Sequence, residues 1–294
     1  MKKYMADSGL LLVGILWGLG FVFVKIGLNG GLEPFYLLTI RFLGGFLILY
    51  LIFRKKVTKL TKEDIKAGII IGVLQFLGYT FQTFGAAITT AGKNAFFTAI
   101  NVVIVPYIFW IIHKKRPDMF AFGASIICLM GVGVMSIDKN LNLTQLNTGD
   151  ILTIICAVFF AGQIALTGYF SRKVEPMKLI LIQMLVAGIF FGLNLLTPNG
   201  IKQIIPLGGM ALISIIYLTV FSTAVATLLQ TYCQRYTTST KASILLSTES
   251  LFAPLFAFFM LSEVLSKRTI LGATLILLAV LVSETKLGLK KVNY

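Results

Sequence analysis

The sequence has few charged side chains. Only 13% of its 294 residues are Asp, Glu, Lys or Arg, whereas 57% are hydrophobic. Soluble proteins average about 25% charged residues, so the charge here is too scarce to cover a chain with this much apolar surface. A helix needs about 20 apolar residues to cross a bilayer. The composition therefore argues against a soluble protein and predicts a polytopic membrane protein with short loops.

Several motifs of catalytic and metal-binding proteins are also missing. The chain has no G-x-x-x-x-G-K-[ST] phosphate loop, which argues against a nucleotide-hydrolysing pump. Its three cysteines (Cys128, Cys156 and Cys233) have neither disulfide nor metal-ligand spacing, so we expect no metal site and no cofactor. The single histidine, His113, and the absence of H-E-x-x-H disfavour an intramembrane enzyme. An enzyme with a Ser/Lys nucleophile stays open as the weakest alternative.

Apolar runs recur along the whole chain, each bounded by charged residues, proline or glycine. Lipid offers no partner to an unpaired backbone group, so each run must be a helix. The predicted fold is an all-α membrane protein with ten transmembrane helices. They lie at roughly 8–27, 35–53, 66–87, 92–112, 118–137, 149–170, 176–196, 206–232, 241–261 and 269–287.

Lys and Arg are divided unevenly among the predicted loops. With a cytoplasmic N-terminus, 19 of the 26 basic residues fall on the cytoplasmic side and 6 on the other, while Arg41 lies within a span. Basic loops tend to stay in the cytoplasm, so both termini are expected there, with the protein in the plasma or inner cell membrane. Lys2 and Lys3 precede an apolar run as in a signal peptide, but without a cleavage site we expect a retained first helix.

The chain contains an internal repeat. Residues 89–106 (TTAGKNAFFTAINVVIVP) align with residues 237–254 (TTSTKASILLSTESLFAP) at an offset of 148, and Glu33-Pro34 recurs as Glu175-Pro176 at an offset of 142. We predict two repeats of five spans, residues 1–138 and 149–294. Because five is odd, the second repeat must enter the membrane upside down. Inverted repeats are frequent in secondary transporters, whose substrate site lies near the midplane between the repeats.

Four sequence segments carry a family resemblance that covers essentially the whole chain. They are GILWG at 14–18, Arg41-Phe42, FQTFGAAITTAGKNAFFTAINVVIVP at 81–106, and STESLFAPLFAFFMLSE at 247–263 followed by Gly272. In this order they resemble the EamA family of the drug/metabolite transporter superfamily. The resemblance implies ten helices, cytoplasmic termini and transport of small metabolites, often export of amino acids or related compounds. The chain departs from the family in having Glu249-Ser250 where Glu-Pro is common.

Glu249 is the only one of the eleven carboxylates that the sequence puts well inside a span. Burying an ionisable group at this depth of the membrane costs free energy, and such groups are usually functional. Glu249 is therefore the candidate to bind a cationic group of the substrate or to exchange a proton during transport, and burial would favour its protonated form. A structural carboxylate held by Ser247, Ser250 or a neighbouring helix is the alternative.

Polar and aromatic side chains at helical spacing predict a cavity between the repeats. Gln75, Tyr79 and Gln82 share one face of the third span, and the offset of 148 relates them to Thr223, Thr227 and Gln230. The candidate substrate-binding residues are Trp17, Phe21, Tyr79, Gln82, Asn101, Gln163, Thr227, Gln230 and Glu249. Static hydrogen bonding and packing between helices is the alternative. For Arg41, we expect snorkelling towards the outer surface or capping of neighbouring carbonyls, rather than contact with an anion.

The leading functional hypothesis is a secondary-active transporter that uses alternating access, an exporter of amino acids or related small metabolites. A translocator of lipid-linked substrates is the alternative. The expected partners are a small-molecule metabolite, the lipid bilayer and protons as a candidate coupling ion, with no nucleic acid. The protein is expected to be a monomer or a homodimer.

Overall fold

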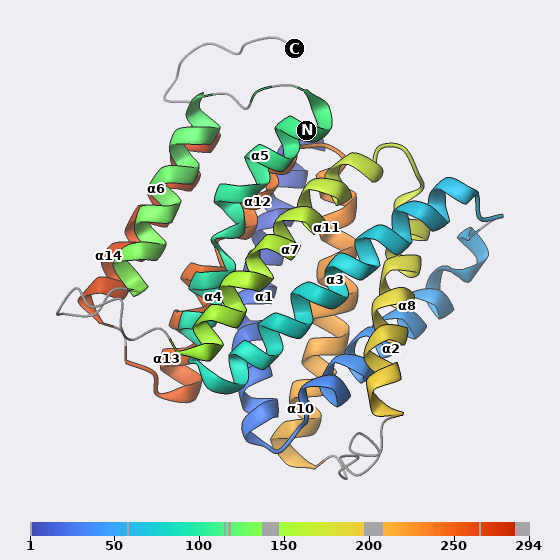
Figure 1. The fold of residues 1–294 in the computed structure, drawn as a ribbon, viewed down its shortest axis with the longest axis horizontal. Coiled ribbons are helices and arrows are strands. Elements are labelled where there is room, and N and C mark those ends of the chain that lie inside the picture. Colours follow the sequence, from blue (N-terminus) through green and yellow to red (C-terminus); the bar gives the residue numbers. More distant parts are fainter. Residues whose placement is uncertain are drawn as a thin grey trace.

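The computed structural model describes residues 2–57, 59–114, 116, 119–136, 147–196, 208–264 and 266–285. Within these ranges every regular element is helical (Figure 1). The first half holds α1 (Lys2–Asn29), α2 (Pro34–Phe53), η1 (Arg54–Lys56), α3 (Lys62–Ile88), α4 (Ala91–Thr98), α5 (Asn101–His113) and α6 (Met119–Ser136). The second half holds α7 (Thr148–Phe170), α8 (Pro176–Leu195), α10 (Gly209–Tyr217), η3 (Leu218–Val225), α11 (Ala226–Gln234), α12 (Ser239–Leu246), α13 (Glu249–Leu261) and α14 (Lys267–Thr285).

Most of these helices are long and apolar enough to cross a membrane. Eight helical segments meet that condition, including three composite ones: α4 with α5, α10 with η3 and α11, and α12 with α13. Helices α6 and α14 carry the shorter apolar stretches Phe122–Gly131 and Ile270–Ala279. The prediction of an all-α, multi-pass membrane protein is confirmed.

The helix starts follow from local sequence. Pro34 and Pro176 are the first residues of α2 and α8, where the missing N–H of proline has no helical partner to lose. A capping box of Thr61 and Asp64 starts α3, and one of Asn147 and Asp150 starts α7.

Two pairs of equivalent helices, one helix from each half, pack against each other at the edges of the bundle. At one edge α6 lies against α14, and at the other α2 lies against α8 (Figure 1). Between them, α1 packs on α11 and α13, while α7 packs on α3, α4 and α5. Gly14 and Gly18 permit the close approach of α1, since a Cβ at Gly18 would lie 2.7 Å from the Phe252 Cβ. The two central helices, α1 and α7, therefore each contact several helices of the opposite half.

The fourth and ninth spans are each interrupted near their middle. The breaks fall between α4 and α5 and between α12 and α13, directly before Asn101 and Glu249. At the breaks, the Val102 N–H donates to the Ala99 carbonyl and the Ser250 N–H donates to the Ser247 carbonyl. These bonds span three residues rather than the four of an α-helix, so the backbone is wound more tightly there. Prolines follow within α5 and α13 and remove one helical hydrogen bond in each. Both breaks therefore bring irregular backbone to the interior of the helix bundle.

Candidate functional site

A cavity lies at the level of these two breaks. Its lining comes from α1, α2, α3, α4, α5, α7, η3, α11, α12 and α13, so it is enclosed by both halves. Its volume is about 40 Å³, which gives room for a few water molecules. Eight of the nine predicted site residues line this one cavity: Trp17, Phe21, Tyr79, Gln82, Asn101, Gln163, Gln230 and Glu249.

The ninth residue, Thr227, is buried in α11 but is not part of the lining. Its prediction assumed regular α-helical spacing from Thr223. The segment η3, which includes Thr223, is instead a π-helix, and a π-helix has more residues in each turn than an α-helix. The predicted polar face is therefore interrupted before α11, and of its three residues only Gln230 lines the cavity.

Glu249 is the first residue of α13 and is 4% exposed. Its carboxylate has no hydrogen bond or ion pair with the residues that the structure describes. The two serines considered as its partners are engaged elsewhere: Ser247 Oγ donates to the Ile244 carbonyl, and Ser250 Oγ donates to the Ser247 carbonyl. The local alternative, a carboxylate held by these serines, is therefore not what the structure shows.

Arg41 also lines the cavity. The expectation that it snorkels to the outer surface is wrong, whereas the expected contact with a carbonyl is present, because Nη2 donates to the Ser222 carbonyl at 3.5 Å. The side chain is 3% exposed. Its Nη2 donates to Ser222 Oγ at 3.0 Å and its Nε donates to Thr223 Oγ1, while the guanidinium lies 4.5 Å from the centre of the Tyr79 ring. Residues far away in sequence supply these partners, which satisfy some of the N–H donors of the guanidinium. The sequence signal for a buried role was that Arg41 is the one basic residue well inside a predicted span.

Amide side chains cover much of the polar wall. Gln163 and Gln230 donate to each other reciprocally, at 3.4 and 3.2 Å, and Gln82 Nε2 donates to Thr98 Oγ1 at 3.2 Å. The side-chain oxygens of Gln75, Asn94 and Asn101 have no hydrogen-bond partner among the described residues. Buried amides normally make hydrogen bonds, so these oxygens are acceptors available to a ligand or to water. Among these amides, only Gln75 and Asn94 lie outside the predicted set of site residues.

Aromatic rings form the remaining wall. Trp17 Nε1 donates to the Ser222 carbonyl at 2.9 Å, a group in the irregular segment η3. The Tyr79 ring packs edge-on against Phe42 and Phe160, with centroids 5.0 Å apart in both cases. These contacts fix the Trp17 and Tyr79 rings in place.

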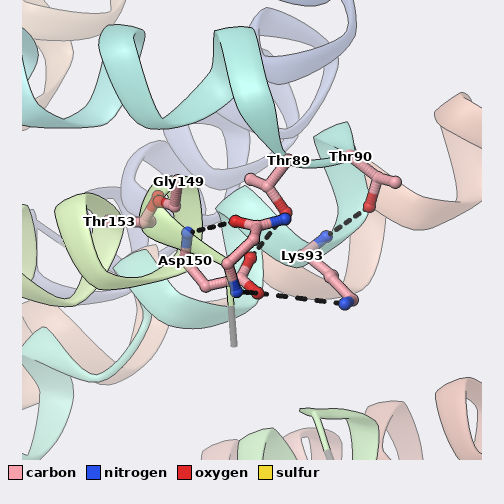
Figure 2. Close-up of polar contacts among 7 residues, drawn as sticks. Thr89, Thr90, Lys93, Gly149, Asp150 and Thr153 are labelled. Atoms are coloured by element: carbon pink, nitrogen blue, oxygen red, sulfur yellow. Dashed lines mark hydrogen bonds and ion pairs between the residues drawn. The ribbon is translucent and has the colours of Figure 1, made fainter. Parts of the chain in front are cut away.

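An ion pair lies near the start of α4 and α7. Lys93 Nζ is 3.9 Å from Asp150 Oδ2, and Asp150 Oδ1 accepts a 2.6 Å bond from Thr89 Oγ1 (Figure 2). The side chain of Lys25, from the last turns of α1, donates to the Thr89 carbonyl at 2.8 Å. We call this part of the molecule the Asp150 end.

The opposite part of the molecule has related contacts. Lys241 Nζ is 2.7 Å from Asp7 Oδ2, and Arg172 Nη2 donates to the Thr237 carbonyl at 2.5 Å. We call it the Asp7 end. The offset of 148 relates Lys93 to Lys241 and Thr89 to Thr237. Equivalent lysines therefore form the ion pair at each end. The carbonyls of equivalent threonines accept a hydrogen bond from a basic side chain at each end.

Glu263 adds a contact at the Asp150 end alone. Its carboxylate accepts bonds from the Ala91 N–H at 2.9 Å and the Gly92 N–H at 3.2 Å, at the N-terminus of α4. An anion is favourable at a helix N-terminus. This contact connects the loop after α13 to the start of α4.

The apolar helices, the two related halves and the polar cavity between them define a multi-pass membrane protein of the transporter class. The profile of the EamA-like transporter family matches the chain twice, over residues 5–137 and again over residues 147–285. The chain belongs to this family, and the two matches correspond to its two repeats.

Relatives agree with this assignment. An uncharacterized transporter of Archaeoglobus fulgidus is 35% identical over 96% of this chain and 86% of its own length. The uncharacterized transporter YoaV of Bacillus subtilis is 23% identical over 97% of this chain and 98% of its own. A solved crystal structure with 12% identity covers 96% of both chains at a TM-score of 0.74, which indicates a shared fold. The names of both relatives specify neither a substrate nor a direction of transport.

Proposed function

We propose that this protein is a secondary-active transporter that exports amino acids or related small metabolites by alternating access. The observation that carries the proposal is the cavity itself, which both repeats enclose and which the ionisable side chains of Arg41 and Glu249 line. Hydrogen-bonding amides and aromatic rings complete its lining, as expected for a small amphipathic ligand. This lining supports the proposal that the residues around the cavity bind the substrate.

The course of the central helices supports an inverted repeat. Helix α1 begins beside Lys241 at the Asp7 end and reaches Thr89 at the Asp150 end through Lys25. Asp150 lies in the first turn of helix α7, and the helix is followed by Arg172, which contacts Thr237 at the Asp7 end. The equivalent helices therefore run in opposite directions. Such repeats can close either end with similar contacts, which alternating access requires.

In the proposed topology, α6 and α14 are the fifth and tenth spans, and the Asp7 end faces the cytoplasm. The two helices pack against each other at the edge of the bundle. The distribution of Lys and Arg supports this orientation, in which both termini would lie in the cytoplasm.

Glu249 has two proposed roles, which the same site allows. As a carboxylate it would attract an ammonium group of the substrate, and as a neutral acid it would release or take up a proton when the cavity opens to water. Both roles need an ionisable group that protein contacts do not already neutralise, and the described residues offer Glu249 no such contact.

Counterflow in proteoliposomes tests the proposal. Vesicles that contain the purified full-length protein are loaded with each of the twenty amino acids, and entry of the same labelled amino acid is measured. We expect counterflow of at least one of them, weakened in Glu249→Gln and lost in Gln82→Ala. Lys66→Gln, on an exposed part of α3, is the control that should retain it. No counterflow of any amino acid would reject this substrate class and favour a ligand such as a lipid-linked compound.

A further inference from the structure

Arg41 is a buried cation without a counter-ion in the described part of the chain. Four ion pairs occur there, and none includes Arg41. The polar groups that it reaches are neutral: the hydroxyls of Ser222, Thr223 and Tyr79 and the Ser222 carbonyl. Neutral acceptors orient a guanidinium, but they do not balance its charge. A buried charge that lacks a partner is costly to maintain.

These neutral contacts hold the guanidinium in one orientation and leave part of it available. They involve Nε and Nη2, while Nη1 donates to none of the residues described. The Tyr79 ring supports the guanidinium from one side. A guanidinium has five N–H donors in a planar fork that matches a carboxylate. Arg41 is thus fixed beside the cavity with donors to spare.

The two repeats differ in charge at this position. The offset of 142, which relates Glu33-Pro34 to Glu175-Pro176, relates Arg41 to Gln183. The offset of 148 relates Asn101 to Glu249. The first repeat therefore has the cation Arg41 where the second has the amide Gln183. The second repeat has the carboxyl group of Glu249 where the first has the amide Asn101. Arg41 and Glu249 both line the cavity, yet they form no ion pair with each other.

We infer that Arg41 binds the carboxylate of the transported metabolite and makes that carboxylate a requirement for recognition. The inference rests on the proposed function, because it needs a metabolite that enters this cavity. A carboxylate at Arg41 would supply the missing counter-charge. The asymmetry of charge between the repeats gives a ligand with separate carboxylate and ammonium groups one preferred orientation, with its ammonium group towards Glu249.

The experiment compares ligands that differ only at the carboxylate. Thermal shifts of the purified full-length protein are titrated with each of the twenty amino acids and with its carboxamide. A ligand stabilises the state that it binds. Losing a hydrogen-bonded charged group should weaken binding about 10- to 100-fold, so the amides should require that much more ligand for the same shift. Sodium chloride at matched concentration tests whether a simple anion alone is enough.

Three variants assign this preference to Arg41. Arg41→Lys keeps the charge and should retain the preference for acid over amide with weaker binding, whereas Arg41→Gln should lose the preference. The matched control is Gln183→Leu, at the equivalent buried position outside the cavity, which should keep the full preference. If Arg41→Gln does not fold, the role of Arg41 is still tested by Arg41→Lys and by the comparison of acids with amides in the unmodified protein.

Each result has a distinct meaning. Equal binding of acids and amides, or a preference that survives in Arg41→Gln, would overturn the role of Arg41 while leaving amino-acid transport intact. A shift with chloride that depends on Arg41 and equals the shift with amino acids would make Arg41 an inorganic-anion site and also overturn the inference. If neither acids nor amides bind, the proposed substrate class fails, and the inference fails with it.

Discussion

Removing the Lys241–Asp7 ion pair should open the Asp7 end of the cavity. The two charged atoms lie 2.7 Å apart, and the side chains are 16% and 12% exposed. At an effective dielectric constant of 20 their attraction would be about 6 kcal/mol, and desolvation of both ions offsets most of it. Exposed pairs contribute about 0.2–1 kcal/mol, so for this largely buried pair we expect a net 1–2 kcal/mol. Lys241→Gln should therefore shift the closed–open equilibrium about 5- to 30-fold.

The related pair at the Asp150 end should contribute less. Lys93 and Asp150 are 3.9 Å apart, and the Lys93 side chain is 38% exposed. A pair of this kind lies at the lower end of the range for exposed ion pairs, about 0.5 kcal/mol or less. Lys93→Gln should therefore increase opening at the Asp150 end only about twofold.

The assay measures access to the cavity from each side of the membrane. A cysteine replaces Thr98, which lines the cavity, in a background where Cys128, Cys156 and Cys233 are Ala. Its reaction rate with a membrane-impermeant thiol reagent is measured in proteoliposomes, with reagent on one side at a time. Lys241→Gln should accelerate reaction from the Asp7 side and Lys93→Gln from the other. The reasoning fails if Lys241→Gln behaves like the exposed control Lys66→Gln or accelerates reaction from the Asp150 side.

Three further predictions follow from single contacts. Glu249→Gln keeps the shape of the side chain but cannot exchange a proton, so transport measured across a pH series should lose its pH dependence; an unchanged profile would exclude the proton role. Gly18→Ala should lower thermal stability by about 1–3 kcal/mol, because the new Cβ would lie 2.7 Å from Phe252 Cβ; Gly123→Ala, with no atom within 4 Å of its Cβ, should cause no loss. Glu263→Gln weakens a charged cap on α4 and should increase thiol access from the Asp150 side, which an unchanged rate would contradict.

The helical fold could be predicted from the sequence because the bilayer imposes it. Each apolar run must be a helix of nearly fixed length, and basic residues mark many of the loops. The cavity could be predicted because two independent regularities agree, the helical period within a span and the offset between repeats. Gln82 and Gln230 satisfy both, and the structure brings them to the same cavity.

The features that could not be predicted depend on contacts between distant segments. Arg41 is buried because Ser222 and Thr223 from η3 and Tyr79 from α3 receive its donors, and composition alone cannot show that these groups meet. The π-helical segment η3 likewise contains no proline or glycine from which the irregularity could be predicted. It interrupts the predicted polar face between Thr223 and α11, and Thr227 is the one predicted site position that the cavity does not include.

The contacts at the two ends differ in a way that bears on alternating access. The proposed alternating access needs both closed states within a few kcal/mol of each other, since a large difference would hold the protein in one of them. The Asp7 end has the shorter and more buried ion pair, Lys241–Asp7. The Asp150 end has the weaker pair, Lys93–Asp150, and in addition the cap of Glu263 on α4. The added cap offsets the weaker ion pair, so two ends built from related but unequal contacts can close with comparable free energies.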